Sequence, residues 1–258
     1  MSEALLQLLG ITQEMLITGF VVMLRVGGAM ATMPALGERG VPMRVRLAAT
    51  IALTVIVAPM VDVPYYNSLT EVAFSMTLAS EAGIGLVFGL GLRFFIFALQ
   101  VAGTMAAQST SLSQIFGTSS NVDPQPAMGH LLVVSGLTLA VMSDLHVQVA
   151  AALAESYRVL PVGAVIGASD ALEWGLAQTT RAFGMGFTLA SPFIIASLIY
   201  NIALGVINRA MPQLMVAFVG APAITAGGLI LMFLATPYLL SLWLQAFNTY
   251  LATPFGSG

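Results

Sequence analysis

The chain has 258 residues, of which 58% are hydrophobic and only 7% are charged, and its formal net charge is −3. Soluble domains carry about 25% charged residues, so this composition excludes a water-soluble globular protein and indicates an α-helical membrane protein. The small acidic excess argues against nucleic-acid binding, and the absence of cysteine excludes disulfides, thiolate metal sites and a cysteine nucleophile.

Long apolar blocks follow one another along the chain and predict an all-α membrane-type protein with about six long, kinked helices. The blocks lack period-two alternation, and backbone in lipid must satisfy its own hydrogen bonds, so both features favour helices. The blocks cover residues 15–36, 47–63, 72–107, 127–143, 182–208 and 214–247.

The block lengths do not match a single bilayer. The third block has 36 residues and would extend about 54 Å, against about 30 Å of hydrocarbon. Pro192, Pro222 and Pro237 interrupt the last two blocks and should kink or break the helices. Uneven and broken helices are tolerated when they pack on protein, so this pattern indicates a subunit of an assembly.

Arginines are concentrated in one early stretch. Arg25 lies inside the first block, and the segment 37–46 (GERGVPMRVR) adds Arg39, Arg44 and Arg46 before and within the start of the second. The first turn of a helix disfavours cations, so these side chains should meet anionic lipid headgroups or acidic protein surfaces. Their clustering in the first loop assigns it to the cytoplasmic side, where we expect partner contacts.

The third block carries two charges and a glycine pattern. Glu81 and Arg93 are twelve residues apart, which is about 18 Å along one helix, so they cannot pair with each other. A charge at mid-bilayer costs about 2.5–3.5 kcal/mol on insertion scales, so we predict that these two and Arg25 are buried charges that pair across helices or subunits for assembly. A solute or proton pathway in a secondary transporter is the alternative. Gly85 and Gly89 form a GxxxG pattern, which predicts close helix packing.

The connections after the third block are also informative. Residues 108–128 are polar and free of arginine, which predicts the longest loop. Residues 143–161 place apolar side chains four apart and predict an amphipathic helix, capped by Ser143 or Asp144 and ended before the proline at its last position. The next helix should begin near residue 170.

No arrangement of residues supports an enzyme. His130 and His146 lie in different segments without metal-ligand spacing, and Ser135 and Ser143 have no base placed beside them. The glycine-rich stretch 83–91 follows no predicted strand and fails the dinucleotide-binding spacing. We therefore expect no catalytic residues, no cofactor and no metal site.

Four stretches resemble one protein family. They are LRVGGAMATMPALGERGVPMRVRLA (24–48), DPQ (123–125), LAESYRVLPVG (153–163) and NIALGVINRAMPQLMVAFVGAPAITAGGL (201–229). With them the chain resembles, from about residue 15 to 245, the FliR family of flagellar biosynthetic proteins, whose virulence counterparts are type III secretion export-gate subunits. The form ERGVPMRVRLA is similar to the flagellar rather than the virulence branch, and the homologous virulence-type subunit is the alternative.

The resemblance implies a single export-gate domain over residues 1–258, FliP-like over about 1–165, with a FliQ-like helical hairpin over about 166–258. It implies a core subunit that forms, with FliP and FliQ, the pore passing unfolded flagellar proteins across the bacterial inner membrane. FlhB and FlhA would be its neighbours in the flagellar basal body. It also implies a plug loop before Asp123, with Phe116 as the plugging side chain. The loop residues concerned are Ser113, Gln114, Ile115, Phe116 and Gly117.

Overall fold

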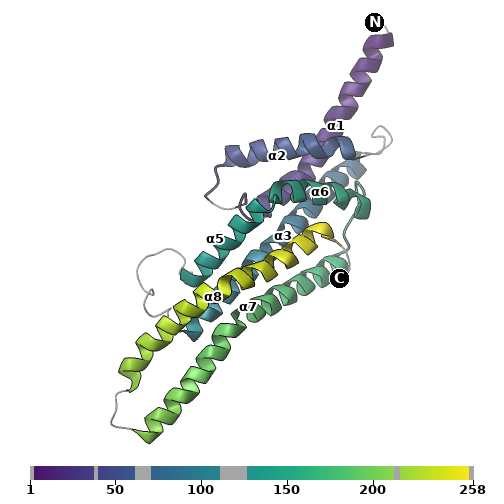
Figure 1. Ribbon diagram of the computed structural model, residues 1–258. Coiled ribbons are helices and arrows are strands. Elements are labelled where there is room, and N and C mark those ends of the chain that lie inside the picture. Colours follow the sequence, from purple (N-terminus) through teal and green to yellow (C-terminus); the bar gives the residue numbers. More distant parts are fainter. Residues whose placement is uncertain (1–2, 38–39, 62–70, 111–126, 212–215, 256–258) are drawn as a thin grey trace. The chain divides into compact units, whose positions relative to one another are not determined.

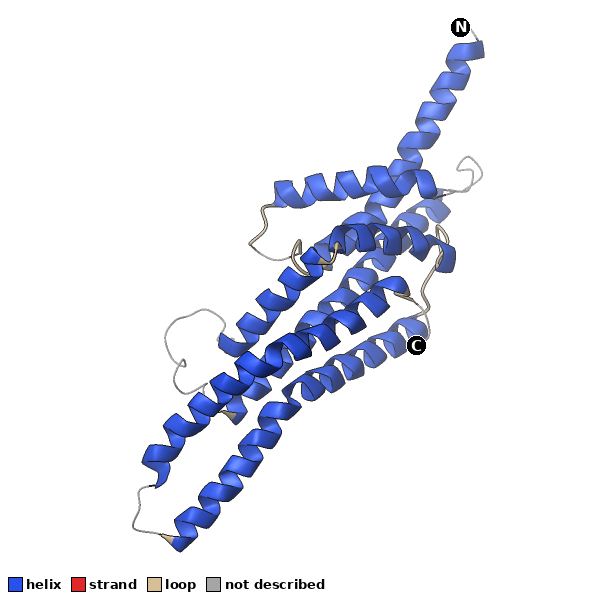
Figure 2. Cartoon of the chain, in the orientation of Figure 1, coloured by secondary structure: helices blue, strands red, loops and turns tan. Residues whose placement is uncertain are grey.

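The computed structural model describes residues 3–37, 40–61, 71–110, 127–211 and 216–255. Within these ranges all regular structure is helical and no strand occurs, which confirms the predicted all-α class (Figure 2). The elements labelled in Figure 1 and their neighbours are α1 (Glu3–Thr32), α2 (Met43–Val57), the short 3-10 helix η1 (Ala58–Met60), α3 (Glu71–Ser109), α5 (Ala127–Met142), α6 (Leu145–Val159), α7 (Ala168–Ala210) and α8 (Val216–Ala252).

Five helices in the described part of the chain are long and apolar enough to cross a membrane, and α5 with α6 can form a sixth span that is bent by 74°. The bend lies at Asp144, whose backbone is left-handed with φ 59° and ψ 40°. Asp144, one of the two predicted candidates, is therefore the N-cap residue of α6, although its side chain makes no capping hydrogen bond. The start of α7 at Ala168 agrees with the predicted start near residue 170.

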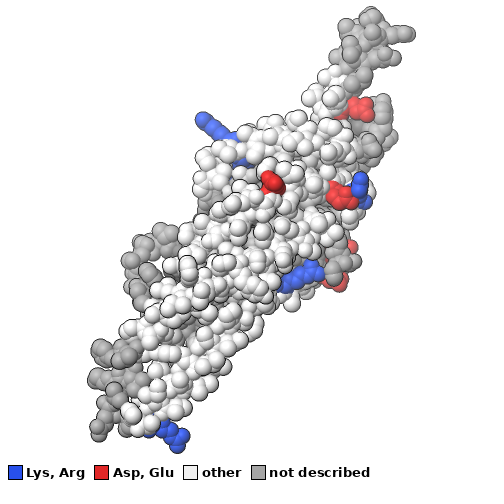
Figure 3. Space-filling view, viewed as in Figure 1, with Lys and Arg blue, Asp and Glu red and all other residues white. Residues whose placement is uncertain are grey.

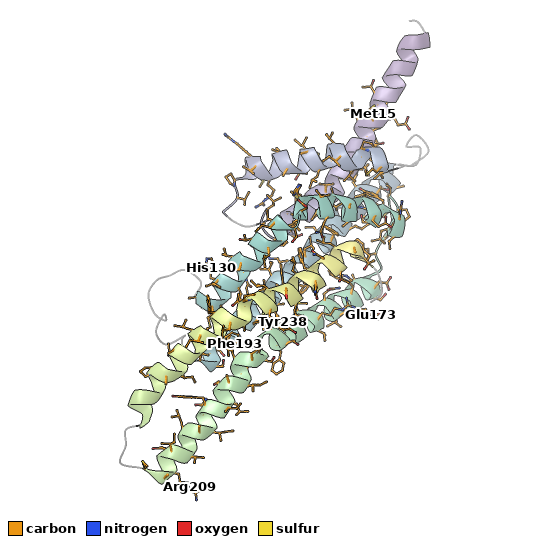
Figure 4. The ribbon with its side chains drawn as sticks, in the orientation of Figure 1. Met15, His130, Glu173, Phe193, Arg209 and Tyr238 are labelled. Atoms are coloured by element: carbon orange, nitrogen blue, oxygen red, sulfur yellow. The ribbon has the colours of Figure 1, made fainter. Side chains whose placement is uncertain are left out.

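Four helices are longer than the thickness of a bilayer core: α1, with 30 residues, extends about 45 Å, and three others are longer still. α3, α7 and α8 contain 39, 43 and 37 residues, so they extend about 58, 64 and 55 Å, against about 30 Å of hydrocarbon. α7 continues through Pro192, and α8 continues through Pro222 and Pro237, so the predicted prolines do not break these helices. A bend of α7 is visible where Figure 4 labels Phe193, next to the proline that removes one hydrogen bond of the helix.

The chain divides into two compact units, each built from separate segments. The first unit contains residues 1–93, 143–175 and 248–258, and the second contains residues 94–142 and 176–247. In the first unit α2 packs on α1 and contacts α6. These units do not have the boundaries of the FliP-like and FliQ-like parts that the resemblance implies, and that division stays a prediction.

The second unit is held together around Trp243 of α8, which is fully buried. Its ring stacks on Phe247 with centroids 5.0 Å apart, and its indole N–H donates to the backbone carbonyl of Phe95 on α3 at 2.9 Å. Gly136 of α5 lies against the same ring, since a Cβ there would be 3.5 Å from it. Trp243 therefore joins α3, α5 and α8.

The helices α7 and α8 run side by side in the second unit (Figure 1). The hydroxyl of Tyr200 on α7 donates to the carbonyl of Gly220 on α8 at 2.6 Å. Large apolar side chains nevertheless remain exposed on both helices, including Phe187 at 56% and Phe233 at 81%. Figure 3 shows few charged side chains on the visible face, which is what a membrane-embedded surface requires.

Candidate functional site

Arg25 of α1 and Glu81 of α3 form a buried ion pair in the first unit. The Arg25 Nε–H donates to Glu81 Oε2 at 2.7 Å, and Nη2–H donates to Oε1 at 2.9 Å, so the contact is bidentate. Both side chains are 0% exposed. In the described part of the chain they are the only charged residues classed as buried.

The pair lies within the apolar stripes that pack α1 and α3. Buried positions recur on α1 at three- and four-residue spacing, which places Arg25 in the middle of the face that meets the rest of the unit. The buried residues of α1 are Val21, Val22, Arg25, Val26, Ala29 and Met30, followed by Met33 and Pro34 beyond its end. Glu81 begins the corresponding stripe on α3, which continues through Ile84, Phe88 and Leu92.

Glycines allow the two helices to approach closely beside the pair. A Cβ on Gly85 would contact the carbonyl oxygen of Arg25 and would lie 2.8 Å from its carbonyl carbon. A Cβ on Gly28, on the opposite helix, would lie 2.5 Å from the Ala82 carbonyl oxygen. Gly89 faces α1 one turn further on, where the hydroxyl of Thr32 donates to the Leu86 carbonyl at 3.2 Å. The backbones of α1 and α3 are therefore in contact at glycines, where there is room for a hydrogen atom but not for a Cβ.

The remaining hydrogen bonds of the pair go to α6 and the turn after it. Arg25 Nη1–H donates to the Ser156 hydroxyl at 3.1 Å, and Nη2–H donates to the Leu160 carbonyl at 3.0 Å. The Gly163 N–H donates to Glu81 Oε1 at 3.1 Å. The guanidinium carbon also lies 3.6 Å from the ring centroid of Tyr157, which is a cation–π contact.

This arrangement satisfies the charges almost completely. Four of the five guanidinium N–H groups have acceptors, and both carboxylate oxygens accept hydrogen bonds. A buried ion pair needs such additional bonds, because desolvation of two charges otherwise exceeds their attraction. With no exposed atom and no second buried acid in the described part of the chain, the site is suited to holding helices together.

Sequence reasoning identified Arg25 and Glu81 from the cost of charges in apolar blocks, but it did not identify their partners. Ser156, Tyr157 and Gly163 lie inside the stretch 153–163. This stretch contributed to the family resemblance, but no role was predicted for its residues. Arg93 is not part of the cluster: it is partly exposed and forms no ion pair with any acidic residue among those described.

The other predicted site residues lie elsewhere. Arg44 is exposed in the first turn of α2, and Arg46 is partly buried, with its Nε–H donating to the Leu36 carbonyl at 3.0 Å. Arg39 lies outside the described residues.

The predicted plug residues 113–117 and Asp123 also lie outside the described residues. The helix that leads into this segment is held in place, because the hydroxyl of Ser197 on α7 donates to the carbonyl of Ser109 at 2.6 Å. His130 on α5 (Figure 4) and His146 on α6 are both exposed. Among the described residues, no group of three or more histidine or acidic side chains could hold a metal ion.

Comparison with known proteins gives a consistent result. The family model described as bacterial export proteins, family 1, matches residues 16–250. The flagellar biosynthetic protein FliR of Caulobacter vibrioides is 30% identical over 236 residues, which cover 89% of this chain and 92% of that protein. The FliR proteins of Escherichia coli and Aquifex aeolicus are each 30% identical, over 239 and 234 residues, and each match covers 88% of both chains.

Proposed function

The chain belongs to the bacterial export proteins, family 1, and on that premise we propose that it is a core subunit of a flagellar type III protein export gate. The observation that carries the proposal is the match over residues 16–250, together with relatives that are FliR proteins along nearly their whole length. The coarser statement follows directly: the chain is a membrane-embedded component of a flagellar export apparatus.

The finer proposal is that the chain forms a pore with FliP and FliQ, beside FlhA and FlhB, in the bacterial inner membrane. The three longest helices support it, because at about 55–64 Å they extend beyond any bilayer core. Their apolar side chains stay exposed along much of that length, including Phe183 at 58% and Ile199 at 63%. Exposed apolar surface beyond the lipid must be covered by other protein. FliP and FliQ subunits would provide this cover.

Within this proposal the predicted residues have three roles. Arg25 and Glu81 hold the subunit in the shape that assembles, and Arg93 provides a charge for a neighbouring subunit. Arg39, Arg44 and Arg46 contact partners or lipid headgroups on the cytoplasmic side. Residues 113–117 close the resting pore, with Phe116 as the plug. We expect no catalytic activity from the chain itself.

Co-purification tests the proposal. An affinity tag on this chain should recover FliP-like and FliQ-like proteins from detergent-solubilised membranes of the native cell as one stable complex. The chain alone, expressed without them, should aggregate or unfold in detergent, because exposed helix faces lack their cover. A monodisperse and thermally stable monomer that recovers no such partners would contradict the proposal.

The transporter alternative predicts that Arg25 and Glu81 line a solute pathway. Their complete burial and mutual pairing do not support that role, since a solute would have to displace a satisfied ion pair. The transporter alternative would be supported if the purified chain alone took up a small solute in proteoliposomes and lost this uptake on substitution of Glu81.

A further inference from the structure

We infer that the Arg25–Glu81 pair is a clip that positions the turn between α6 and α7, in addition to joining α1 to α3. The inference concerns the geometry of this chain and does not depend on the proposed function. Besides the two hydrogen bonds between them, Arg25 and Glu81 make three more, and all three go to the segment from Ser156 to Gly163.

Arg25 completes the C-terminal end of α6. The last helical hydrogen bond there runs from the Leu160 N–H to the Ser156 carbonyl at 2.8 Å. Leu160 is the C-cap, with φ −123° and ψ 86°, so no left-handed residue closes the helix at this point. The Leu160 carbonyl instead accepts a hydrogen bond from Arg25 Nη2–H at 3.0 Å. A cation at the negative end of a helix is also electrostatically favourable.

Glu81 holds the turn that follows. The Ala164 N–H donates to the Pro161 carbonyl at 3.0 Å, which closes a four-residue turn. Gly163 is its third residue and has φ +78°, the conformation that favours glycine at this position of a type II turn. The N–H of Gly163 points to Glu81 Oε1, and a Cβ on Gly163 would lie 3.2 Å from the Thr77 hydroxyl of α3. The turn therefore rests on α3, between Thr77 and Glu81.

The two charged groups together bind both sides of one bend. Arg25 binds the last carbonyl before Pro161, and Glu81 binds the N–H two residues after it. An apolar pair of similar volume could fill the same space between α1 and α3, and such replacements are often neutral or stabilising. Apolar side chains could not hold the Leu160 carbonyl or the Gly163 N–H. The polar pair thus performs a positioning task that packing alone does not.

Hydrogen exchange of the full chain, in its purified complex, tests the clip. The double variant Arg25→Met with Glu81→Leu replaces the pair by apolar side chains. The Gly163 amide should exchange at least about tenfold faster, because its hydrogen bond to Glu81 is lost. The Leu160 and Ala164 amides, whose backbone bonds lie on either side of it, should also exchange faster because the turn is no longer held. Amides of α3 at residues 84–92 should exchange as in the parent. Gln148→Ala is the matched control, since it removes a bond to the Ser143 carbonyl at the other end of α6.

A second variant keeps the inference testable if the double variant does not fold. Arg25→Lys retains the positive charge beside Glu81 but lacks the planar fork that reaches both Ser156 and Leu160. It should also speed exchange of the Leu160 amide at the end of α6, because the Leu160 carbonyl loses its hydrogen bond from Arg25. Parent-like exchange there, in either folded variant, would overturn the clip. An increase spread evenly over α1, α3 and α6 would overturn it as well, because it would assign the pair to general stability.

Discussion

The crossing of α1 and α3 permits a matched pair of substitutions two residues apart. Gly85 and Gly83 are both in α3, so alanine gains the same helix propensity at either position, about 0.5–1 kcal/mol. Their surroundings differ completely. A Cβ on Gly83 meets no atom within 4 Å, whereas a Cβ on Gly85 would lie 2.8 Å from the Arg25 carbonyl carbon and 3.0 Å from the Ala29 nitrogen.

The magnitude follows from these distances. Carbon atoms in contact are about 3.5–4.0 Å apart, so Gly85→Ala forces α1 and α3 apart by about 1 Å. The clash is with backbone atoms, which cannot rotate away. Overpacking of this kind costs about 1–3 kcal/mol. The same shift lengthens the bidentate bonds between Arg25 and Glu81, now 2.7 and 2.9 Å, and weakens a pair whose complete loss costs about 3–5 kcal/mol. We expect a net destabilisation of about 2 kcal/mol or more, whereas Gly83→Ala should stabilise slightly.

Thermal unfolding of the purified complex in one detergent would measure this difference. A difference near 3 kcal/mol between the two variants corresponds to about 6–12 °C for a chain of this size. Gly85→Ala should therefore unfold well below the parent, and Gly83→Ala at or above it. If Gly85→Ala unfolded at the same temperature as Gly83→Ala, the close approach of the two backbones would be refuted.

Three further predictions concern other parts of the chain. Glu81→Gln leaves the Arg25 charge buried and uncompensated, so the yield of assembled complex in pull-downs should fall severalfold. Normal assembly, together with protein export that depends on pH in the parent but not in the variant, would support the proton pathway instead. Trp243→Phe keeps the stacked ring but loses the bond to the Phe95 carbonyl, and should cost about 1–2 kcal/mol in thermal unfolding; an unchanged Tm would show that this bond contributes nothing. Phe116→Ala should leave assembly intact and raise ion leakage through the gate, measured as conductance in planar bilayers. Unchanged conductance in the assembled variant would show that Phe116 does not plug the pore.

The helical class and the family could be predicted from the sequence because they depend on composition and on local pattern. A chain with 7% charged residues and long apolar blocks can form its backbone hydrogen bonds in lipid only as helices. The importance of Arg25 and Glu81 was predictable for a related reason, since a charge in an apolar block is costly wherever the block lies. The glycine spacing of residues 85 and 89 pointed in the same way to a packed face.

The tertiary structure alone decided how these features meet. Arg25 pairs with a residue 56 positions away and caps a carbonyl 135 positions away, and no spacing rule relates such positions. The helices also continue through their prolines, because the loss of one hydrogen bond is small beside the packing and the remaining bonds of a helix of 37 or more residues. Local sequence determines which groups must be buried and which helices form. Only the crossing of those helices, at points where glycine lets their backbones touch, determines which buried groups become partners.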